Sequence, residues 1–274
     1  MPAHKGKFPA LGGIQNFDIT EIPDTGSLFD GEGATALAEA QAQKLFGSAA
    51  TFMSAGGCTL CIQAMFRAAA PHGGKVVCGR VVHRSAVNAM SLLGIEPVWV
   101  LPDPSAGELF SGRITAEGVR RALEKTPEAK AVYITSPDYF GVISDVKSIA
   151  AVAREFGVPL LVDCAHGAHL KFLEKDISPL NLGAAMSAES AHKTLPVLTG
   201  GAWLQIGDES FVPEIRRAMA LFGSTSPSYP IMISLDLARD WLENNADEFI
   251  RLSRRVKKTK KLCRSLRLMR GSGR

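Results

Sequence analysis

No apolar run in this sequence is long enough to cross a bilayer. A membrane-spanning helix needs roughly 18 or more consecutive apolar residues, and no apolar stretch here approaches that length. The first residues, MPAHKGKF, also lack the apolar h-region of a secretion signal. We therefore expect a cytoplasmic protein with no membrane partner.

Cysteine is scarce, and its count is odd. The five cysteines occur without a recognisable secretion signal, so we expect reduced thiols rather than disulfides. Cys58 and Cys61 form a C-x-x-C, but no second pair and no redox-type βαβ context accompany them. We interpret them as small loop and helix residues, keep metal or redox use as the alternative, and expect no metal site.

Acidic residues are missing from the last 24 positions. Residues 251–274 hold eleven Lys or Arg, which leaves residues 1–250 with 20 basic against 27 acidic side chains. Such a block could bind nucleic acid or an anionic membrane. Its apolar residues have rough helical spacing, so we favour the solvated face of a helix and expect no nucleic-acid partner. These apolar residues are Leu252, Val256, Leu262, Leu266 and Met269.

Short apolar segments alternate with amphipathic ones along most of the 274 residues, a length that suits one large α/β domain. The expected strands are residues 75–79, 96–101, 131–136, 158–163 and 184–190, the expected helices are 34–46, 115–125 and 146–157, and the segment 81–94 carries His83 into another helix. This alternation predicts βαβ units and a mostly parallel sheet flanked by helices.

Three regions follow from this pattern. We expect an irregular segment over residues 1–30, a large domain over 31–245 and a basic helix over 246–274. The chain stops at GSGR directly after that helix, which we interpret as an interruption.

Lys193 is placed like a reactive amine rather than a surface charge. It follows a short apolar strand, with Ser190 and His192 just before it. An aldehyde cofactor needs an amine to bond covalently, and its phosphate needs hydroxyl, imidazole and backbone N–H donors, two of which Ser190 and His192 could supply. The stretch predicts the Schiff-base lysine of a pyridoxal-phosphate enzyme. The alternative is a loop lysine beside a helix-capping serine.

Two glycines suggest where the phosphate would lie. Gly56 and Gly57 lead into a helix, and the N–H groups and dipole at a helix N-terminus favour an anion. A plain loop is the alternative explanation.

Asp163 ends an apolar strand, where a carboxylate is costly unless a cation or donor meets it. A protonated pyridine nitrogen is such a partner, and the ring can then accept electrons released from the substrate. The alternative is a structural aspartate that caps the following turn. Ser136, Asp163 and Lys193 all follow strand ends, the edge of a parallel sheet where ligands bind, so we expect them in one site.

Three histidines are candidates. His83 could stack on a cofactor ring or be an ordinary core histidine. His166 and His169 form a close pair that invites a metal interpretation, but no further ligand completes a set, so the metal site remains the alternative.

The chain resembles the Orn/Lys/Arg decarboxylase family of fold-type I pyridoxal-phosphate enzymes over almost its whole length. The matching stretches, in order, are MPAHKGKF, FDITEIPDTGSLFDGEG, SAGGCTLCIQAM, VVHRSAVNAMSLLGIEPVWV, ITSPDYFGVISD, LLVDCAHGAHLKF, SAHKTLPVLTGGAWL and FGSTSPSYPIMISLDLAR. The resemblance implies an α/β large domain of the aspartate-aminotransferase-like type and pyridoxal 5'-phosphate as cofactor.

It also implies roles for individual residues. Lys193 would bond the cofactor, Asp163 would pair with its pyridine nitrogen, His166 would reach the ring hydroxyl side, and His83 would stack on the ring. The expected phosphate ligands are Gly57, Cys58, Thr59, Ser190 and His192. Ser224 and Thr225 would reach the site of a neighbouring subunit, which implies a homodimer with a shared active site.

Two departures qualify the resemblance. Cysteines occupy SAGGCTLC where relatives commonly carry another small or hydroxyl residue, and the small C-terminal domain of family members does not follow residue 274.

The implied reaction is decarboxylation of arginine, lysine or ornithine, with arginine the first choice. Asp18 and Glu21 could receive the substrate's distal cation, or they could be exposed loop acids. An aminotransferase or lyase on the same fold, and a truncated, non-catalytic protein, remain alternatives.

Overall fold

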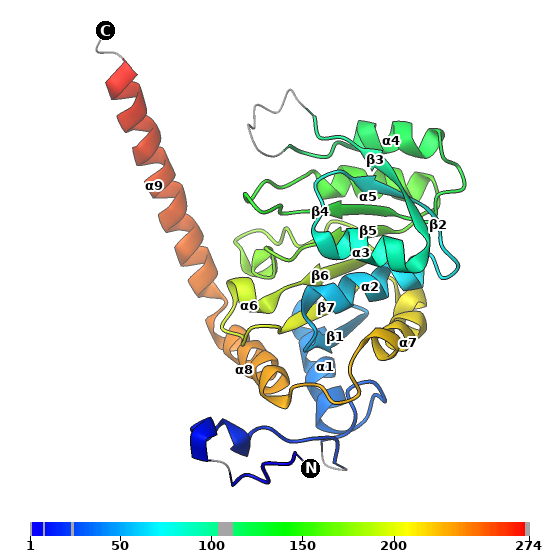
Figure 1. The fold of residues 1–274 in the computed structure, drawn as a ribbon. Helices are drawn as coiled ribbons and strands as arrows, with labels where there is room; N and C mark the ends of the chain where they lie inside the picture. Colours follow the sequence, from blue (N-terminus) through cyan, green and yellow to red (C-terminus); the bar gives the residue numbers. More distant parts are fainter. Residues whose placement is uncertain (1, 8, 23–24, 104–111, 272–274) are drawn as a thin grey trace.

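The computed structural model describes residues 2–7, 9–22, 25–103 and 112–271. One seven-stranded sheet organises this part of the chain, with helices on both faces (Figure 1). The strands, in chain order, are β1 (Ala50–Ser54), β2 (Gly74–Gly79), β3 (Ile95–Val100), β4 (Val132–Thr135), β5 (Leu160–Asp163), β6 (Met186–Glu189) and β7 (Ala202–Ile206).

The sheet has the order β1-β7-β6-β5-β4-β2-β3. Five strands, from β3 across to β6, pair in parallel, while β7 pairs antiparallel with both β6 and β1. The predicted α/β fold with a mostly parallel sheet is therefore confirmed. The sequence pattern does not predict β1 and β7.

The helices have bounds close to those expected in the first two thirds of the chain. They are α1 (Gly33–Phe46), α2 (Gly57–Ala69), α3 (Arg84–Leu93), α4 (Ala116–Glu124), α5 (Val146–Glu155), α6 (Ala191–Thr194), α7 (Val212–Phe222), α8 (Tyr229–Asn245) and α9 (Asp247–Gly271). The caps explain several starts. Thr115 accepts from the N–H of Gly118 at the start of α4, and Asp145 accepts from that of Ser148 at the start of α5.

Alternation along the strands divides the core between the two faces. On one face Tyr133 and Leu161 pack with α2, α3 and α7, and on the other Val132 and Val162 pack with α4 and α5. Near β1 and β7 that second face is covered by α1 and α8, with Trp203 fully buried among them.

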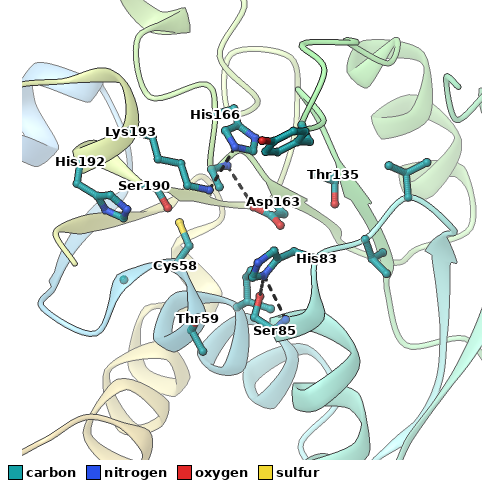
Figure 2. A pocket seen from close by; sticks show the side chains of 16 residues that line it. Cys58, Thr59, His83, Ser85, Thr135, Asp163, His166, Ser190, His192 and Lys193 are labelled. Carbon is teal, nitrogen blue, oxygen red and sulfur yellow. Dashed lines mark hydrogen bonds between the residues drawn. The ribbon is translucent and has the colours of Figure 1, made fainter. Parts of the chain in front are cut away.

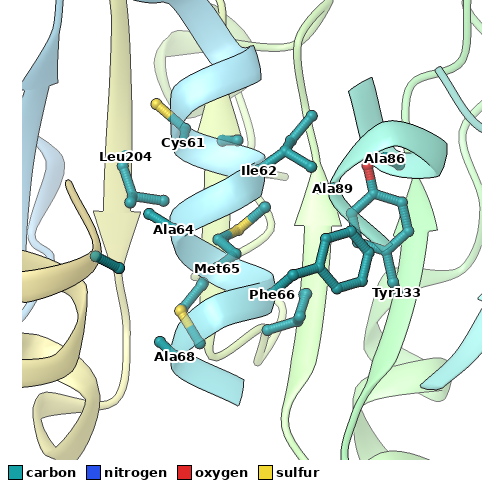
Figure 3. Packing of buried hydrophobic residues seen from close by; sticks show 14 of the residues in the cluster. Cys61, Ile62, Ala64, Met65, Phe66, Ala68, Ala86, Ala89, Tyr133 and Leu204 are labelled. Carbon is teal, nitrogen blue, oxygen red and sulfur yellow. The ribbon is translucent and has the colours of Figure 1, made fainter. Parts of the chain in front are cut away.

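Helix α2 lies at the centre of the first face. Eight of its thirteen residues are buried, and Phe66 stacks on Tyr133 with ring centroids 4.7 Å apart (Figure 3). Burial of a side chain of this size contributes about 2–3 kcal/mol. The packing fixes the N-terminus of α2 against the ends of the central strands.

Helix α9 extends away from the sheet (Figure 1). Near its start Phe249 contacts the rings of His169 and Phe172, and Arg254 forms an ion pair of 3.0 Å with Glu174. The basic residues of this helix whose side chains are described are exposed, as expected for its solvated face, and the apolar residues Leu252, Val256 and Leu262 are exposed as well. The side chains of Leu266 and Met269 lie outside the described residues.

The N-terminal segment contains only two short 3-10 helices, η1 (Pro9–Leu11) and η2 (Ile14–Asn16), among its described residues.

Strand β3 is at one edge of the sheet. Its Pro97 has no N–H to offer outward, and Glu96 is exposed.

Candidate active site

A cavity of about 350 Å³ lies at the carboxyl ends of the central strands. It collects residues from five separate segments of the chain, as Figure 2 shows. The lining residues are Gly57, Cys58, Thr59, Ile62, Val81, Val82, His83, Ser85, Thr135, Tyr139, Asp163, Ala165, His166, Ser190, His192 and Lys193. Nine of the twelve predicted site residues thus line one cavity.

Lys193 lies on α6, the single helical turn that follows β6. Its side chain is exposed, and its Nζ lies 3.3 Å from His166 Nε2. Ser190 occupies the N-cap position of this turn, yet its side chain makes no capping hydrogen bond. The alternative of a helix-capping serine beside an ordinary loop lysine is therefore not supported.

Asp163 is the last residue of β5 and is 2% exposed. Its Oδ1 accepts from the N–H of Ala165 at 3.1 Å, and its Oδ2 accepts from the hydroxyl of Tyr133 at 3.3 Å. Burial raises the pKa of Asp163, whereas these donors and the charges of Lys193 and His83 oppose that rise. The residue does cap the turn that follows, and it also lines the cavity.

His83 is the N-cap of α3. Its Nδ1 accepts from the N–H of Ser85 at 3.2 Å and lies 2.9 Å from that residue's hydroxyl oxygen. Because Nδ1 accepts, the ring proton of the neutral imidazole is on Nε2. The half-buried ring lines the cavity, so His83 is not an ordinary core histidine (Figure 2).

The two histidines after Asp163 separate. His166 lines the cavity, and burial together with the charge of Lys193 lowers its pKa. His169 stacks on Phe249 with centroids 6.2 Å apart, and burial lowers its pKa. They do not form a metal pair, and no group of three or more His, Cys, Asp or Glu within the described ranges could hold a metal ion.

The first turn of α2 forms the wall on which a phosphate was predicted. Helix α2 starts at Gly57, whose φ of 66° suits glycine and whose N–H donates to Gly200 O at 2.8 Å. The next N–H groups, of Cys58 and Thr59, have no intrahelical acceptor. Ser190, the N-cap of α6, and His192 of α6 line the same cavity as Cys58 and Thr59 (Figure 2).

The Cys58 thiol is protonated rather than reactive. Burial raises its pKa, and contact with Cys61 raises it further. All five cysteines are free, and four of them are buried.

Three predicted residues do not line this cavity. Ser136 is 2% exposed, and its Oγ accepts from the N–H of Ser144 at 3.2 Å, so it stabilises its own loop. Ser136 does not line the cavity, and its assignment as a cofactor ligand stays a prediction. Ser224 and Thr225 are exposed on the connection between α7 and α8, and their role in a second subunit stays a prediction.

Thr135, the neighbour of Ser136, lines the cavity but was not among the predicted site residues. Thr135 pairs in register with Asp163, lines the cavity, and has a buried Oγ1 without a hydrogen-bond partner among the described residues. Tyr133, two residues earlier, donates to Asp163. Alternation along the strand is the signal that could have found both, because the last strand residue and not the one after it faces the site.

Asp18 and Glu21 lie outside this cavity. Asp18 pairs with His4 at 3.0 Å, and Glu21 accepts from the hydroxyl of Thr20, which lowers its pKa. Asp18 and Thr20 line a second hollow of about 440 Å³ together with residues 226–228.

No helix in the described part of the chain has the length and apolar character to span a bilayer.

Comparison with known proteins identifies the class first. The fold aligns with the constitutive lysine decarboxylase of Escherichia coli at a TM-score of 0.78, with 23% identity over 100% of this chain and 42% of that one. It also aligns with an aspartate aminotransferase of Thermus thermophilus at 0.66, with 20% identity, 93% of this chain and 69% of that one. The sheet and cavity thus define a fold-type I large domain, the fold expected from the sequence.

The family follows from closer relatives. The family model of the Orn/Lys/Arg decarboxylase major domain matches residues 12–270, and the chain belongs to that family. It is 36% identical to the uncharacterized protein YaaO of Bacillus subtilis, over 86% of this chain and 50% of that protein. It is 32% identical to an arginine decarboxylase of the same organism, over 88% and 51%. The chain spans about half the length of these relatives.

Proposed function

We propose that this chain forms the pyridoxal-phosphate site of a decarboxylase that acts on a basic amino acid, with arginine the favoured substrate. The observation that carries the proposal is that Lys193 and the buried Asp163 line one cavity. Two relatives named arginine decarboxylase, 32% and 33% identical, support the choice of arginine over lysine.

The residues present fit the cofactor. Asp163 is a buried acid that lines the cavity, and its hydrogen-bond partners among the described residues, Tyr133 and Ala165, are uncharged. A pyridinium N–H in the cavity would therefore stabilise its carboxylate. Thr135 Oγ1 is a buried hydroxyl without a partner in the described part of the protein. At the other end, the N-terminus of α2 offers N–H groups suited to a phosphate.

Each residue then has a defined task. When bound, pyridoxal phosphate supplies an electron sink for the pair released as a bond to the substrate's α-carbon breaks. Lys193 would provide the amine that attaches the cofactor, and Asp163 would keep the proton on its ring nitrogen. His83 would cover one side of the cavity, while Ser190, His192 and the first turn of α2 would hold the phosphate and so orient the group.

The first experiment tests attachment. Purified protein incubated with pyridoxal phosphate should turn yellow, and borohydride reduction should leave the cofactor on the peptide that contains Lys193. Lys193→Ala should abolish the label, whereas Lys171→Ala, a lysine paired with Asp176 away from the cavity, should not. Label on another lysine, or none, would refute the proposed site.

The second experiment tests the reaction. Mass analysis after incubation with arginine, lysine or ornithine should detect agmatine most strongly, ahead of cadaverine or putrescine. A 2-oxo acid in place of the amine would indicate an aminotransferase. Cofactor attachment with no product from any of the three would point to a binding domain without catalysis.

A homodimer with a shared active site completes the proposal. The exposed residues Ser224 and Thr225 adjoin the hollow that contains Asp18. Within the described residues, Asp163 is the single acid that lines the cavity, so a second copy could supply the acid that meets the substrate's distal cation. Asp18 is a candidate for that role.

A further inference from the structure

His166 presents one ring nitrogen to Lys193. The two atoms, Nε2 and Nζ, are 3.3 Å apart (Figure 2). A lysine ammonium can only donate, so Nε2 accepts and the proton of the neutral imidazole is on Nδ1. Nδ1 is buried and has no hydrogen-bond partner among the described residues. A buried N–H in that state needs an acceptor or a negative charge nearby.

Asp138 supplies an unused acceptor. It is 3% exposed, and its Oδ1 accepts from the N–H groups of Phe140 at 2.8 Å and Val142 at 2.9 Å. Those bonds hold the carboxylate in one orientation. Its other oxygen, Oδ2, is buried and lacks a partner within the described ranges. A carboxylate oxygen left in this position is costly unless a donor or cation faces it.

The sheet register brings the two residues together. Thr135 of β4 pairs with Asp163 of β5, and Asp138 and His166 each follow three residues later. The two loops pack closely, since a Cβ added to Gly167 would lie 2.8 Å from Pro137 Cδ. The ring of Tyr139 meets the His166 ring edge-on, with centroids 5.8 Å apart.

The charges around His166 come from three other segments. Lys193 on α6 and His83 before α3 disfavour the protonated ring, as burial does, and together they lower the pKa of His166. Asp138, after β4, is the group that acts in the opposite direction. Asp163 lies on the same segment as His166, and Tyr139 contributes the ring contact.

We propose that Asp138 is a positioning residue that keeps the ring proton of His166 on Nδ1 and leaves Nε2 as the acceptor facing Lys193. A proton that leaves an amine at the position of Lys193 Nζ can then move to His166 Nε2. The Asp138 carboxylate, on the other side of the ring, stabilises the imidazolium that forms. A water molecule that bridges Oδ2 and Nδ1 would satisfy both buried atoms. The assignment of that amine rests on the proposed function, whereas the state of the His166 ring does not.

The test measures the ring directly. In protein with isotope-labelled histidine and no added cofactor, NMR spectra report the tautomer and the titration of each of the six histidines. His166→Gln identifies the His166 signal by its loss. In Asp138→Asn, the ratio of the Nδ1–H to the Nε2–H tautomer of His166 should fall about tenfold, and the pKa of His166 should fall further below its usual range.

The Asn variant keeps an oxygen for the N–H groups of Phe140 and Val142, so the loop should survive. The matched control is Asp145→Asn, which removes a carboxylate from the same β4–α5 connection but one that caps α5. It should leave His166 unchanged. If Asp138→Asn does not fold, Asp138→Thr provides the same measurement. An unchanged tautomer ratio and pKa of His166 in a folded variant would overturn the proposal, whether or not the protein binds a cofactor.

Discussion

Glu189 is an acid enclosed in the protein one residue before the segment that carries Ser190 and Lys193. It is 3% exposed and accepts from the hydroxyl of Ser187 at 3.3 Å. Burial raises its pKa to about 8, although hydrogen bonds from Ser187 and Gln205 oppose the rise. At neutral pH it is therefore mostly protonated, and the end of β6 next to α6 carries a neutral, hydrogen-bonded group.

This acid makes folding stability depend on pH. Between the usual value of 4.5 and about 8 the folded chain binds more protons at Glu189 than the unfolded chain does. The free energy of unfolding therefore falls as pH rises through that window. Glu189→Gln should flatten this fall, by on the order of a few kcal/mol across the window, as measured by urea unfolding at several pH values.

The flattening should be incomplete, because burial also raises the pKa of Glu39 to about 7 and gives a slope of the same sign. Glu117→Gln, an exposed acid that pairs with Arg121, is the control and should leave the slope unchanged. Identical pH profiles for wild type and Glu189→Gln would contradict the prediction.

At this scale the sequence predicts most of the site and misses a few neighbours. Lys193, Asp163, His83 and His166 could be chosen because their chemistry and the residues around them point to a cofactor. The sequence did not point to Thr135, which lines the cavity where Ser136 does not, because the direction of a side chain depends on where the strand ends and a one-residue difference reverses it. Ser190, His192 and the glycines at the start of α2 were proposed from the residues themselves, whereas Cys58 and Thr59 were added by the family resemblance.

Helix α2 links the core to the site. Phe66 is fully buried and stacks on Tyr133, whose hydroxyl donates to Asp163. The position of the Asp163 carboxylate therefore depends on the packing of Phe66 against Tyr133, which lies outside the cavity lining. The sequence predicts a helix after Gly56 and Gly57, but it cannot show which strand side chain the helix holds in place.

Phe66→Ala should cost about 3–5 kcal/mol of unfolding free energy, since it leaves a cavity beside Tyr133. Thermal or urea unfolding measures this loss. Leu92→Ala, in α3 with 63% of the side chain exposed, is the control and should cost far less. Equal losses for the two variants would show that the stacked pair contributes little.

Strands β1 and β7 are not predicted from the sequence, and the reason is the same for both. Strands β1 and β7 are five residues each, and their pairing is antiparallel, which the βαβ pattern does not imply. Their order at the edge next to β6 depends on contacts between residues about 150 positions apart, such as Thr51 with Gln205 at 2.5 Å. Local periodicity holds no information about such pairs.

At the scale of the whole molecule, we expect association into a dimer. Light scattering should give twice the 29.3 kDa mass of the chain. A mass equal to one chain at the concentrations used for cofactor binding would contradict the shared-site proposal.

The residues proposed to act across the dimer can be tested separately. Ser224→Ala combined with Thr225→Ala should weaken pyridoxal-phosphate binding about tenfold, because hydrogen bonds to a charged phosphate are lost. Fluorescence titration measures the dissociation constant. Thr259→Ala, an exposed hydroxyl on α9 that lines neither the cavity nor the hollow with Asp18, is the control. Unchanged binding in the double variant would remove these two residues from the site.

The outer strand β3 has a consequence for how chains meet one another. Pro97 interrupts the row of outward N–H donors, and the exposed charge of Glu96 would have to be desolvated by any strand laid against it. This border is a poor template for continued β-pairing between copies, so growth into fibrils from that side is discouraged, and self-association is left to surfaces formed by loops and helices.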